Sequence, residues 1–265
     1  MKLNRLFALL LAVCMMLTLC ACGQTGGAYT IVETLSEGSY AIAFRNNDPV
    51  GDYMEAAIKV LASNGKVAEL ETKWFGKTGV TDFEKDGSAL NDLPQPAPRV
   101  MIMGLDPDNF PMSYESNGVY MGFDVEMCRA ACELLGWTLR FSEVGDESEA
   151  FVHLNSGNAD VVWGGMILDT AEQNFSVRCP YMDGGCVLVV LAGSGNGSVR
   201  KLGGQVIAMN SAKRYMDALS TCELIQTAGQ IVVTDDGNDM VFDRLYRGEF
   251  AGIVTDMATA KYYMR

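Results

Sequence analysis

Gly252-Ile253-Val254-Thr255-Asp256 has the composition of a short buried strand that ends on a carboxylate. Its β-branched centre favours an extended backbone, and a helix-like stretch over residues 257–263 follows directly. In an open α/β sheet, ligands bind beyond the carboxyl ends of the strands. Asp256 is therefore suited to hold the ammonium group of a ligand through a charge-assisted hydrogen bond. A simpler interpretation also fits, in which Asp256 only caps the following helix.

Strand-like and helix-like segments alternate along the rest of the chain. Strands are expected at 29–32, 39–44, 100–104, 138–141, 159–163, 187–191, 206–209 and 231–234, and helices at 52–62, 66–75, 123–135, 148–154, 213–219 and 239–246. Such alternation predicts an α/β protein with mostly parallel sheets. At a length of 265 residues, we expect the chain to form two lobes.

The first 21 residues have the pattern of a signal peptide. Two basic residues precede the apolar run 6–19, which is short for a membrane span. Ala21 before Cys22 resembles a bacterial lipoprotein cleavage site. A lipid on Cys22 would anchor the mature chain to a membrane, on its extracytoplasmic side. The alternative is a secretory peptide without a lipid.

The charge of the chain argues against a nucleic-acid partner. The formal net charge is −13, and removal of the signal peptide leaves 18 basic against 33 acidic side chains, a net charge of −15. No basic stripe that could follow a phosphate backbone is present in the sequence. We read this acidity as a solvated surface, and it identifies no substrate.

Cysteine and histidine usage offers little for catalysis or metal binding. Five cysteines follow Cys22, so at least one thiol is unpaired, although Cys179 and Cys186 could pair across a turn. His153 is the only histidine and is expected at a helix end, as a surface or capping residue. No catalytic motif is recognisable, so we predict a protein that is not an enzyme and that needs no cofactor or metal.

Residues 77–98 interrupt the regular pattern. The stretch is rich in glycine and charge and ends in Pro94-Gln95-Pro96-Ala97-Pro98. Prolines at this spacing favour an extended backbone. We interpret residues 77–98 as a linker.

Several short motifs occur in the order and at the spacings of one protein family. They are Gly104-Leu105-Asp106 with Phe110-Pro111-Met112, then Gly122-Phe123-Asp124, the segment 154–165 with its Ser156-Gly157 and Trp163, Pro180-Tyr181, and finally 252–256. Together they resemble extracellular solute-binding proteins of family 3, which serve polar amino-acid ABC importers. The resemblance implies a type II periplasmic-binding-protein-like fold with two lobes. It also implies an extracytoplasmic protein that captures an amino acid or related small amine for an ABC permease.

The order of the remaining pieces differs from that family. Its closing segment, with the strand that recrosses the hinge and a Lys-Trp-Phe-Gly ending, stands here at the front, as 40–45, 52–61 and 73–76. We interpret the chain as a circular permutant, with the old termini joined by the linker. Lobe 1 is then 41–76 plus 99–181, and lobe 2 is 186–265 plus 28–39. The competing account is a truncated gene behind a remnant of another copy.

The resemblance also implies a set of ligand-binding residues. Asp256 would hold the α-amino group, while the loop with Asp106 and Phe110 contacts the ligand and the strand end with Trp163 and Gly165 lines the cleft. In lobe 2, Asn210, Ser211 and Lys213 would form the turn whose amides suit a carboxylate. The set is Asp106, Phe110, Trp163, Gly165, Asn210, Ser211, Lys213 and Asp256.

Some positions depart from the family pattern. Ala171 stands where the family has its carboxylate-binding Arg, Ile167 replaces an assisting Thr, and Glu147 falls at an aromatic wall position. Lys213 or Arg178 could supply the missing positive charge. Lys213 would do so without the planar guanidinium fork of the family's Arg. We therefore expect a ligand that carries an amine but is anchored differently. The rival interpretations are a ligand sensor, a pseudo-receptor that has lost binding, and, least favoured, an enzyme related to dehydratases.

Overall fold

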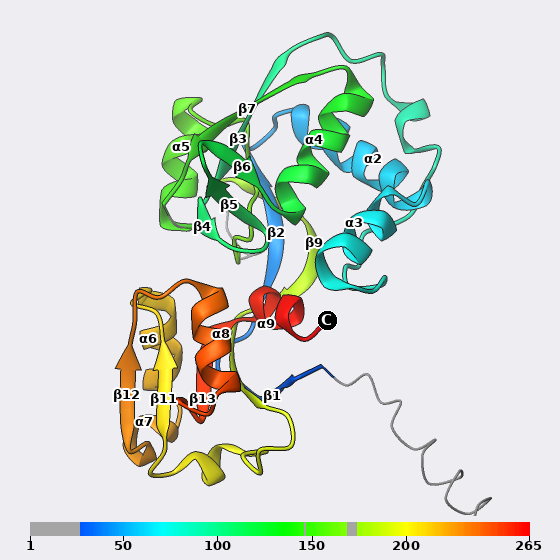
Figure 1. Ribbon diagram of the computed structural model, residues 1–265. Coiled ribbons are helices and arrows are strands. Elements are labelled where there is room, and N and C mark those ends of the chain that lie inside the picture. Colours follow the sequence, from blue (N-terminus) through cyan, green and yellow to red (C-terminus); the bar gives the residue numbers. More distant parts are fainter. Residues whose placement is uncertain (1–26, 146, 169–173) are drawn as a thin grey trace, which may run out of the picture.

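The computed structural model describes residues 27–145, 147–168 and 174–265, without the side chains of Glu147 and Lys213. The predicted signal peptide and Cys22 lie outside the described residues. Within these ranges the chain forms two five-stranded sheets and one three-stranded sheet, with helices packed around them (Figure 1). No helix among the described residues is long and apolar enough to cross a membrane.

The first sheet has the strand order β7-β3-β8-β2-β9. Its strands are β2 (Gly38–Phe44), β3 (Val100–Leu105), β7 (Thr138–Glu143), β8 (Val161–Val162) and β9 (Ser176–Gly184). The surrounding elements are α2 (Val50–Ser63), α3 (Lys66–Phe75), α4 (Phe123–Leu135), α5 (Ala150–Ser156) and a small sheet of β4 (Asp108–Asn109), β5 (Ser113–Ser116) and β6 (Val119–Met121). We call the part around this sheet the first lobe. It is the upper part of Figure 1.

The second sheet has the order β1-β10-β13-β11-β12. Its strands are β1 (Tyr29–Thr34), β10 (Cys186–Leu191), β11 (Val206–Met209), β12 (Gln230–Val233) and β13 (Gly252–Asp256), and its helices are α6 (Lys213–Ser220), α7 (Leu224–Thr227), α8 (Asn238–Tyr246) and α9 (Met257–Tyr263). We call the part around this second sheet the second lobe.

Short 3-10 turns occur in the chain at Ala89–Asp92, Glu147–Glu149 and Val199–Leu202.

The prediction of mostly parallel sheets is wrong. In the first sheet β3 pairs in parallel with β7 and β8, but β2 runs antiparallel to both β8 and β9. In the second sheet β10 runs antiparallel to β1 and β13. The physical reason is that the chain passes between the lobes through β2 and β9, which run in opposite directions side by side. Mixed sheets of this kind are common in α/β proteins.

Residues 38–75, which form β2, α2 and α3, are an integral part of the first lobe. β2 lies between β8 and β9, with Ala43 opposite Val162 on one side and Val177 on the other. In α2, buried Met54, Ile58 and Leu61 recur at helical spacing and pack against the core of this lobe. The two ends of the described chain also meet, because a Cβ placed on Gly27 would lie 2.5 Å from the carbonyl oxygen of Met264.

The linker is held against the first lobe at its start. The buried Glu71 carboxylate accepts hydrogen bonds from the N–H groups of Gly79, Val80 and Thr81, at 2.7, 2.9 and 2.6 Å. Phe83 is buried and stacks on Tyr181, with 4.8 Å between ring centroids. The predicted linker therefore contributes side chains to the core as well as connecting α3 to β3.

Candidate functional site: the pocket between the lobes

A pocket of about 440 Å³ is lined by residues of both lobes. The first lobe contributes Asp106, Asp108 and Gly145, and the second contributes Asn210, Ser211, Ala212, Arg214 and the segment 235–238. It lies beyond the carboxyl ends of β3, β11 and β12. Ligands bind at this position in open α/β sheets.

A larger pocket of about 590 Å³ follows the strands that connect the lobes, between Thr34 and Met257, and contains none of the predicted ligand residues.

Three predicted residues line the pocket between the lobes. Asp106 follows β3 directly and its carboxylate accepts the N–H of Asp108 at 2.9 Å. Asn210 and Ser211 follow β11, and the Asn210 side chain accepts the N–H of Ala212 at 2.9 Å, which fixes the turn before α6. Lys213 is the first residue of α6, and its side chain lies outside the described part.

Asp256 lies behind this pocket in an ion pair. Arg214 donates from Nε to Oδ1 at 3.0 Å and from Nη2 to Oδ2 at 2.8 Å. The Tyr215 hydroxyl donates to the same Oδ2 at 2.5 Å. The Asp256 side chain is 5% exposed, while that of Arg214 is 33% exposed. The carboxylate makes no capping hydrogen bond to α9, so the simpler interpretation of Asp256 does not hold. Binding of a ligand's ammonium by Asp256 stays a prediction.

The contacts of this ion pair keep Arg214 charged and Tyr215 neutral. Burial disfavours the charge on Arg214, but the adjacent Asp256 carboxylate raises the pKa of the guanidinium above its usual value. Burial and the same carboxylate raise the pKa of Tyr215 well above its usual value. At neutral pH Arg214 is therefore a cation in a bidentate contact with the Asp256 carboxylate, and the neutral Tyr215 hydroxyl donates a further hydrogen bond to it.

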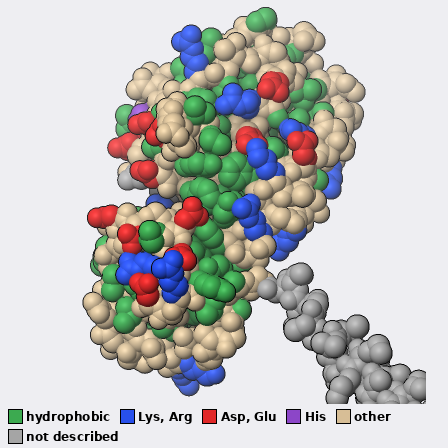
Figure 2. Space-filling model, viewed as in Figure 1, with side chains coloured by type: hydrophobic (Ala, Val, Ile, Leu, Met, Phe, Trp, Pro, Cys, Tyr) green, Lys and Arg blue, Asp and Glu red, His purple; other side chains and the backbone are tan. Residues whose placement is uncertain are grey.

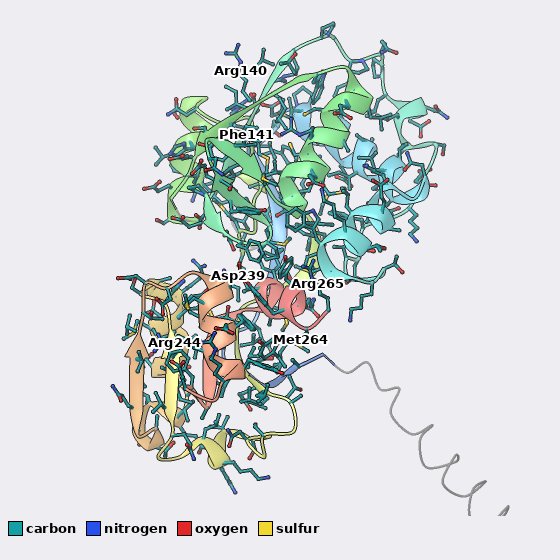
Figure 3. The ribbon with its side chains drawn as sticks, viewed as in Figure 1. Arg140, Phe141, Asp239, Arg244, Met264 and Arg265 are labelled. Atoms are coloured by element: carbon teal, nitrogen blue, oxygen red, sulfur yellow. The ribbon has the colours of Figure 1, made fainter. Side chains whose placement is uncertain are left out.

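Phe110 does not line the pocket and instead contacts α9 at the boundary of the lobes. Its ring packs edge-on against Tyr262, with 4.6 Å between centroids, and its carbonyl oxygen accepts the hydroxyl of Thr259 at 2.7 Å. Figure 2 shows hydrophobic side chains gathering across the middle of this face, where the lobes meet. Figure 3 labels Arg265 at the same boundary, where its guanidinium donates to the carbonyl oxygens of Lys73 and Trp74 at 3.4 Å.

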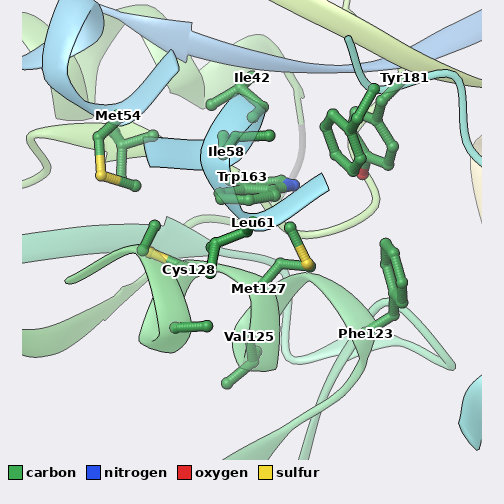
Figure 4. Close-up of a cluster of buried hydrophobic side chains, with 14 of the residues drawn as sticks. Ile42, Met54, Ile58, Leu61, Phe123, Val125, Met127, Cys128, Trp163 and Tyr181 are labelled. Atoms are coloured by element: carbon green, nitrogen blue, oxygen red, sulfur yellow. The ribbon is translucent and has the colours of Figure 1, made fainter. Parts of the chain in front are cut away.

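Trp163 and Gly165 are buried in the first lobe. Trp163 is fully buried in the core cluster of Figure 4, so in this structure it does not line the pocket. Gly165 has φ +69, and a Cβ there would lie 2.8 Å from the side chain of Asn109, which explains why glycine occupies this position. The contacts of both residues with a ligand stay predictions.

A buried carboxylate that the sequence analysis did not single out lies beside these residues. Oδ2 of Asp124, at the start of α4, accepts the Tyr181 hydroxyl at 2.6 Å and the Gly165 N–H at 2.7 Å. Burial raises the pKa of Asp124 to about 7, and these two hydrogen bonds act against the rise. The sequence signal is Gly122-Phe123-Asp124, one of the family motifs, although Asp124 is not among the ligand-binding residues that the resemblance implies.

The positions that depart from the family pattern are only partly described. Ala171 lies outside the described residues, as does the side chain of Glu147. Arg178 is directed to α2, where it pairs with Asp52 at 2.5 Å, and it does not line the pocket. Cys179 and Cys186 do not pair, and all five cysteines in the described part are free thiols.

Residues 101–241 match the sequence profile described as bacterial extracellular solute-binding proteins, family 3. Because the match covers more than half of the chain, the protein belongs to this family. The chain is thus a member of a family of extracellular binding proteins. A search of curated proteins found no match.

Solved structures of related proteins give a partial overlap. A polar amino acid ABC uptake transporter substrate-binding protein from Streptococcus thermophilus is 25% identical, with a TM-score of 0.47 over 60% of this chain and 61% of that chain. An ABC uptake transporter substrate-binding protein from Streptococcus pneumoniae, with bound histidine, is 23% identical, with a TM-score of 0.45 over 62% and 68%. An ancestral cationic amino acid solute-binding protein is 22% identical, with a TM-score of 0.49 over 63% and 73%. The chain spans about three fifths of the first of these proteins.

Proposed function

We propose that the protein is an extracytoplasmic solute-binding lipoprotein that captures an amino acid or related small amine between its lobes for an ABC importer. The observation that carries the proposal is the pocket with walls from both lobes, in which Asp106, Asn210 and Ser211 converge at strand ends. The family match supports the same class of function. A lipid on Cys22 would keep the protein at the outer face of a membrane.

The way in which the lobes are connected supports a closing mechanism. The adjacent strands β2 and β9 connect the two sheets, and α9 contacts β9 of the first sheet as well as β10 and β13 of the second. A ligand that contacts both walls of the pocket stabilises the arrangement in which those walls are close, by its difference in affinity for the two arrangements. An importer could then distinguish the loaded protein by its shape.

Circular permutation belongs to the same proposal. The family profile begins at residue 101, yet β2, α2 and α3, which precede it, complete the first lobe. The two ends meet at Gly27 and Met264 in the second lobe. We propose lobe boundaries at 41–76 plus 99–181 and at 186–265 plus 28–39. A chain that starts at residue 99, joins Arg265 to Gly27 and ends at residue 76 should fold cooperatively and bind the same ligand. A chain rearranged in this way that stayed unfolded would contradict the permutation.

The binding function can be tested by calorimetry on the purified protein. The panel contains amino acids, small amines and short peptides. We expect a ligand whose affinity falls on Asp106→Ala and Ser211→Ala, because both side chains line the pocket. Asp243→Asn is the matched control, since Asp243 pairs with Arg247 on the surface of α8. Equal losses in the control would show that the pocket is not the site.

One observation favours a second candidate, a sensor or pseudo-receptor without transport. The carboxylate predicted to bind an ammonium is already paired with Arg214. Absence of binding across the panel would favour a pseudo-receptor. Uptake of the labelled ligand can be compared between cells that contain the protein and cells that lack the protein. Ligand binding together with equal uptake in the two would favour a sensor.

A further inference from the structure

Arg214 is held along one edge and open to the pocket along another. Nε and Nη2 are both used on Asp256, and Nη2 also lies 3.3 Å from the Tyr215 hydroxyl. No hydrogen bond from Nη1 occurs among the described residues. Arg214 lines the pocket between the lobes, whereas Asp256 does not. The pocket therefore meets a guanidinium at the position where the sequence predicts a carboxylate.

The position of this guanidinium is fixed before any ligand arrives. The Asp256 carboxylate is almost fully buried and sits at the end of β13, a strand whose residues are all buried. The Tyr215 ring lies beneath the guanidinium, with 4.8 Å from Cζ to the ring centroid, which is a cation–π arrangement. A guanidinium held by one carboxylate retains N–H donors in a plane that suits a second carboxylate.

We propose that Arg214 is a specificity-determining residue that binds the carboxylate of the ligand, with Asp256 and Tyr215 as its positioning residues. The inference rests on the proposed function, since it names the group that the same pocket takes. The ligand class is a small zwitterion. Its acid group lies against Arg214 in the second lobe and its amine faces the acidic rim of Asp106 and Asp108 in the first.

The charge balance of the pocket favours this orientation. A ligand ammonium on Asp256 would have to displace Arg214 and leave its guanidinium without its buried partner, which is unfavourable. A ligand carboxylate on Arg214 breaks no existing contact. The acidic residues of the rim, with Asp235 on the second lobe, would oppose an acid that carries no amine.

The test compares matched ligands by isothermal titration calorimetry. The probes are histidine with histamine, arginine with agmatine, and glutamic acid with γ-aminobutyric acid, pairs that differ only in the α-carboxylate. We expect the amino acid of at least one pair to bind about 100-fold more tightly than its decarboxylated partner. Arg214→Lys keeps the charge beside Asp256 but loses the fork, and it should remove most of this preference.

The control and the alternative variant separate binding from folding. Arg247→Gln removes an exposed arginine of the same lobe and should leave the preference unchanged. If Arg214→Lys does not fold, the neutral pair Arg214→Gln with Asp256→Asn, which leaves no unpaired charge, replaces it and should abolish the preference. Equal binding of both members of every pair, or a preference that survives in these variants, would overturn the inference while leaving the proposed function intact. Binding of no probe would overturn the inference, and silence across the full panel of amino acids, small amines and short peptides would overturn the proposed function as well.

Discussion

Tyr181 on β9 donates a 2.6 Å hydrogen bond to Asp124 at the start of α4. Both groups are fully buried, and β9 is one of the two strands that continue toward the second lobe. The hydrogen bond therefore ties the connection between the lobes to the core of the first lobe. It also involves a carboxyl group whose charge state changes near neutral pH.

The pKa of Asp124 predicts how stability depends on pH. It is about 7 in the folded protein, against an ordinary value of 3.8, so the folded state binds an extra proton between these values. Stability from this group is present below about pH 4 and is lost as the pH rises toward 7. The slope is at most about 1.4 kcal/mol per pH unit. We expect Asp124→Asn to lack this decrease in denaturant unfolding from pH 4.5 to 8, measured relative to the wild-type protein.

The matched control for that measurement is Asp243→Asn on the surface of α8. It should reproduce the pH profile of the wild-type protein, because Asp243 is not in the core. A profile of Asp124→Asn parallel to the wild type would show that Asp124 does not titrate in this range.

Removal of Asp256 should destabilise the second lobe. Asp256→Ala leaves the Arg214 guanidinium without its carboxylate, and we expect a loss of about 2 kcal/mol, reduced by the partial exposure of Arg214. The double variant Arg214→Met with Asp256→Leu removes both charges and should recover much of that loss. The free energy of unfolding of the wild-type protein and of both variants is measured by urea titration. Equal losses in the two variants would mean that the contact has little energetic weight.

Glu71 should control the attachment of the linker. In Glu71→Gln one acceptor oxygen becomes an amide NH2 that faces backbone N–H groups, which costs about 1–3 kcal/mol. We expect lower stability and faster proteolysis within residues 77–98. Glu69→Gln, on the same helix but exposed, serves as the control. Unchanged cleavage within the linker in Glu71→Gln would contradict this role.

The Thr259 hydroxyl should contribute to the contact between the lobes. Thr259→Val keeps the shape but leaves the Phe110 carbonyl oxygen without this donor, with an expected cost of about 1 kcal/mol. Small-angle X-ray scattering should show a larger radius of gyration if the contact holds the lobes together. Thr72→Val, whose hydroxyl bonds only within α3, is the control.

Local sequence pattern determined the elements because hydrophobic spacing and turn residues act over a few residues. The helix 123–135 and the strand 206–209 lie at the predicted positions. The family motifs also indicated the binding class that the profile match supports. The sequence did not reveal the direction of β2 and β9 or the long strand Ser176–Gly184, because strand pairing depends on distant partners.

Only the tertiary structure decided which side chains meet. Arg214 and Asp256 are 42 positions apart, and no spacing rule predicts that the guanidinium would occupy the carboxylate expected to bind a ligand. Likewise, burial in the folded core raises the pKa of Asp124, and the two hydrogen bonds that act against the rise come from Tyr181 and Gly165, far along the chain. Residue types thus set which charges were available, while packing between remote segments determined which of them are neutralised inside the protein and which face the pocket.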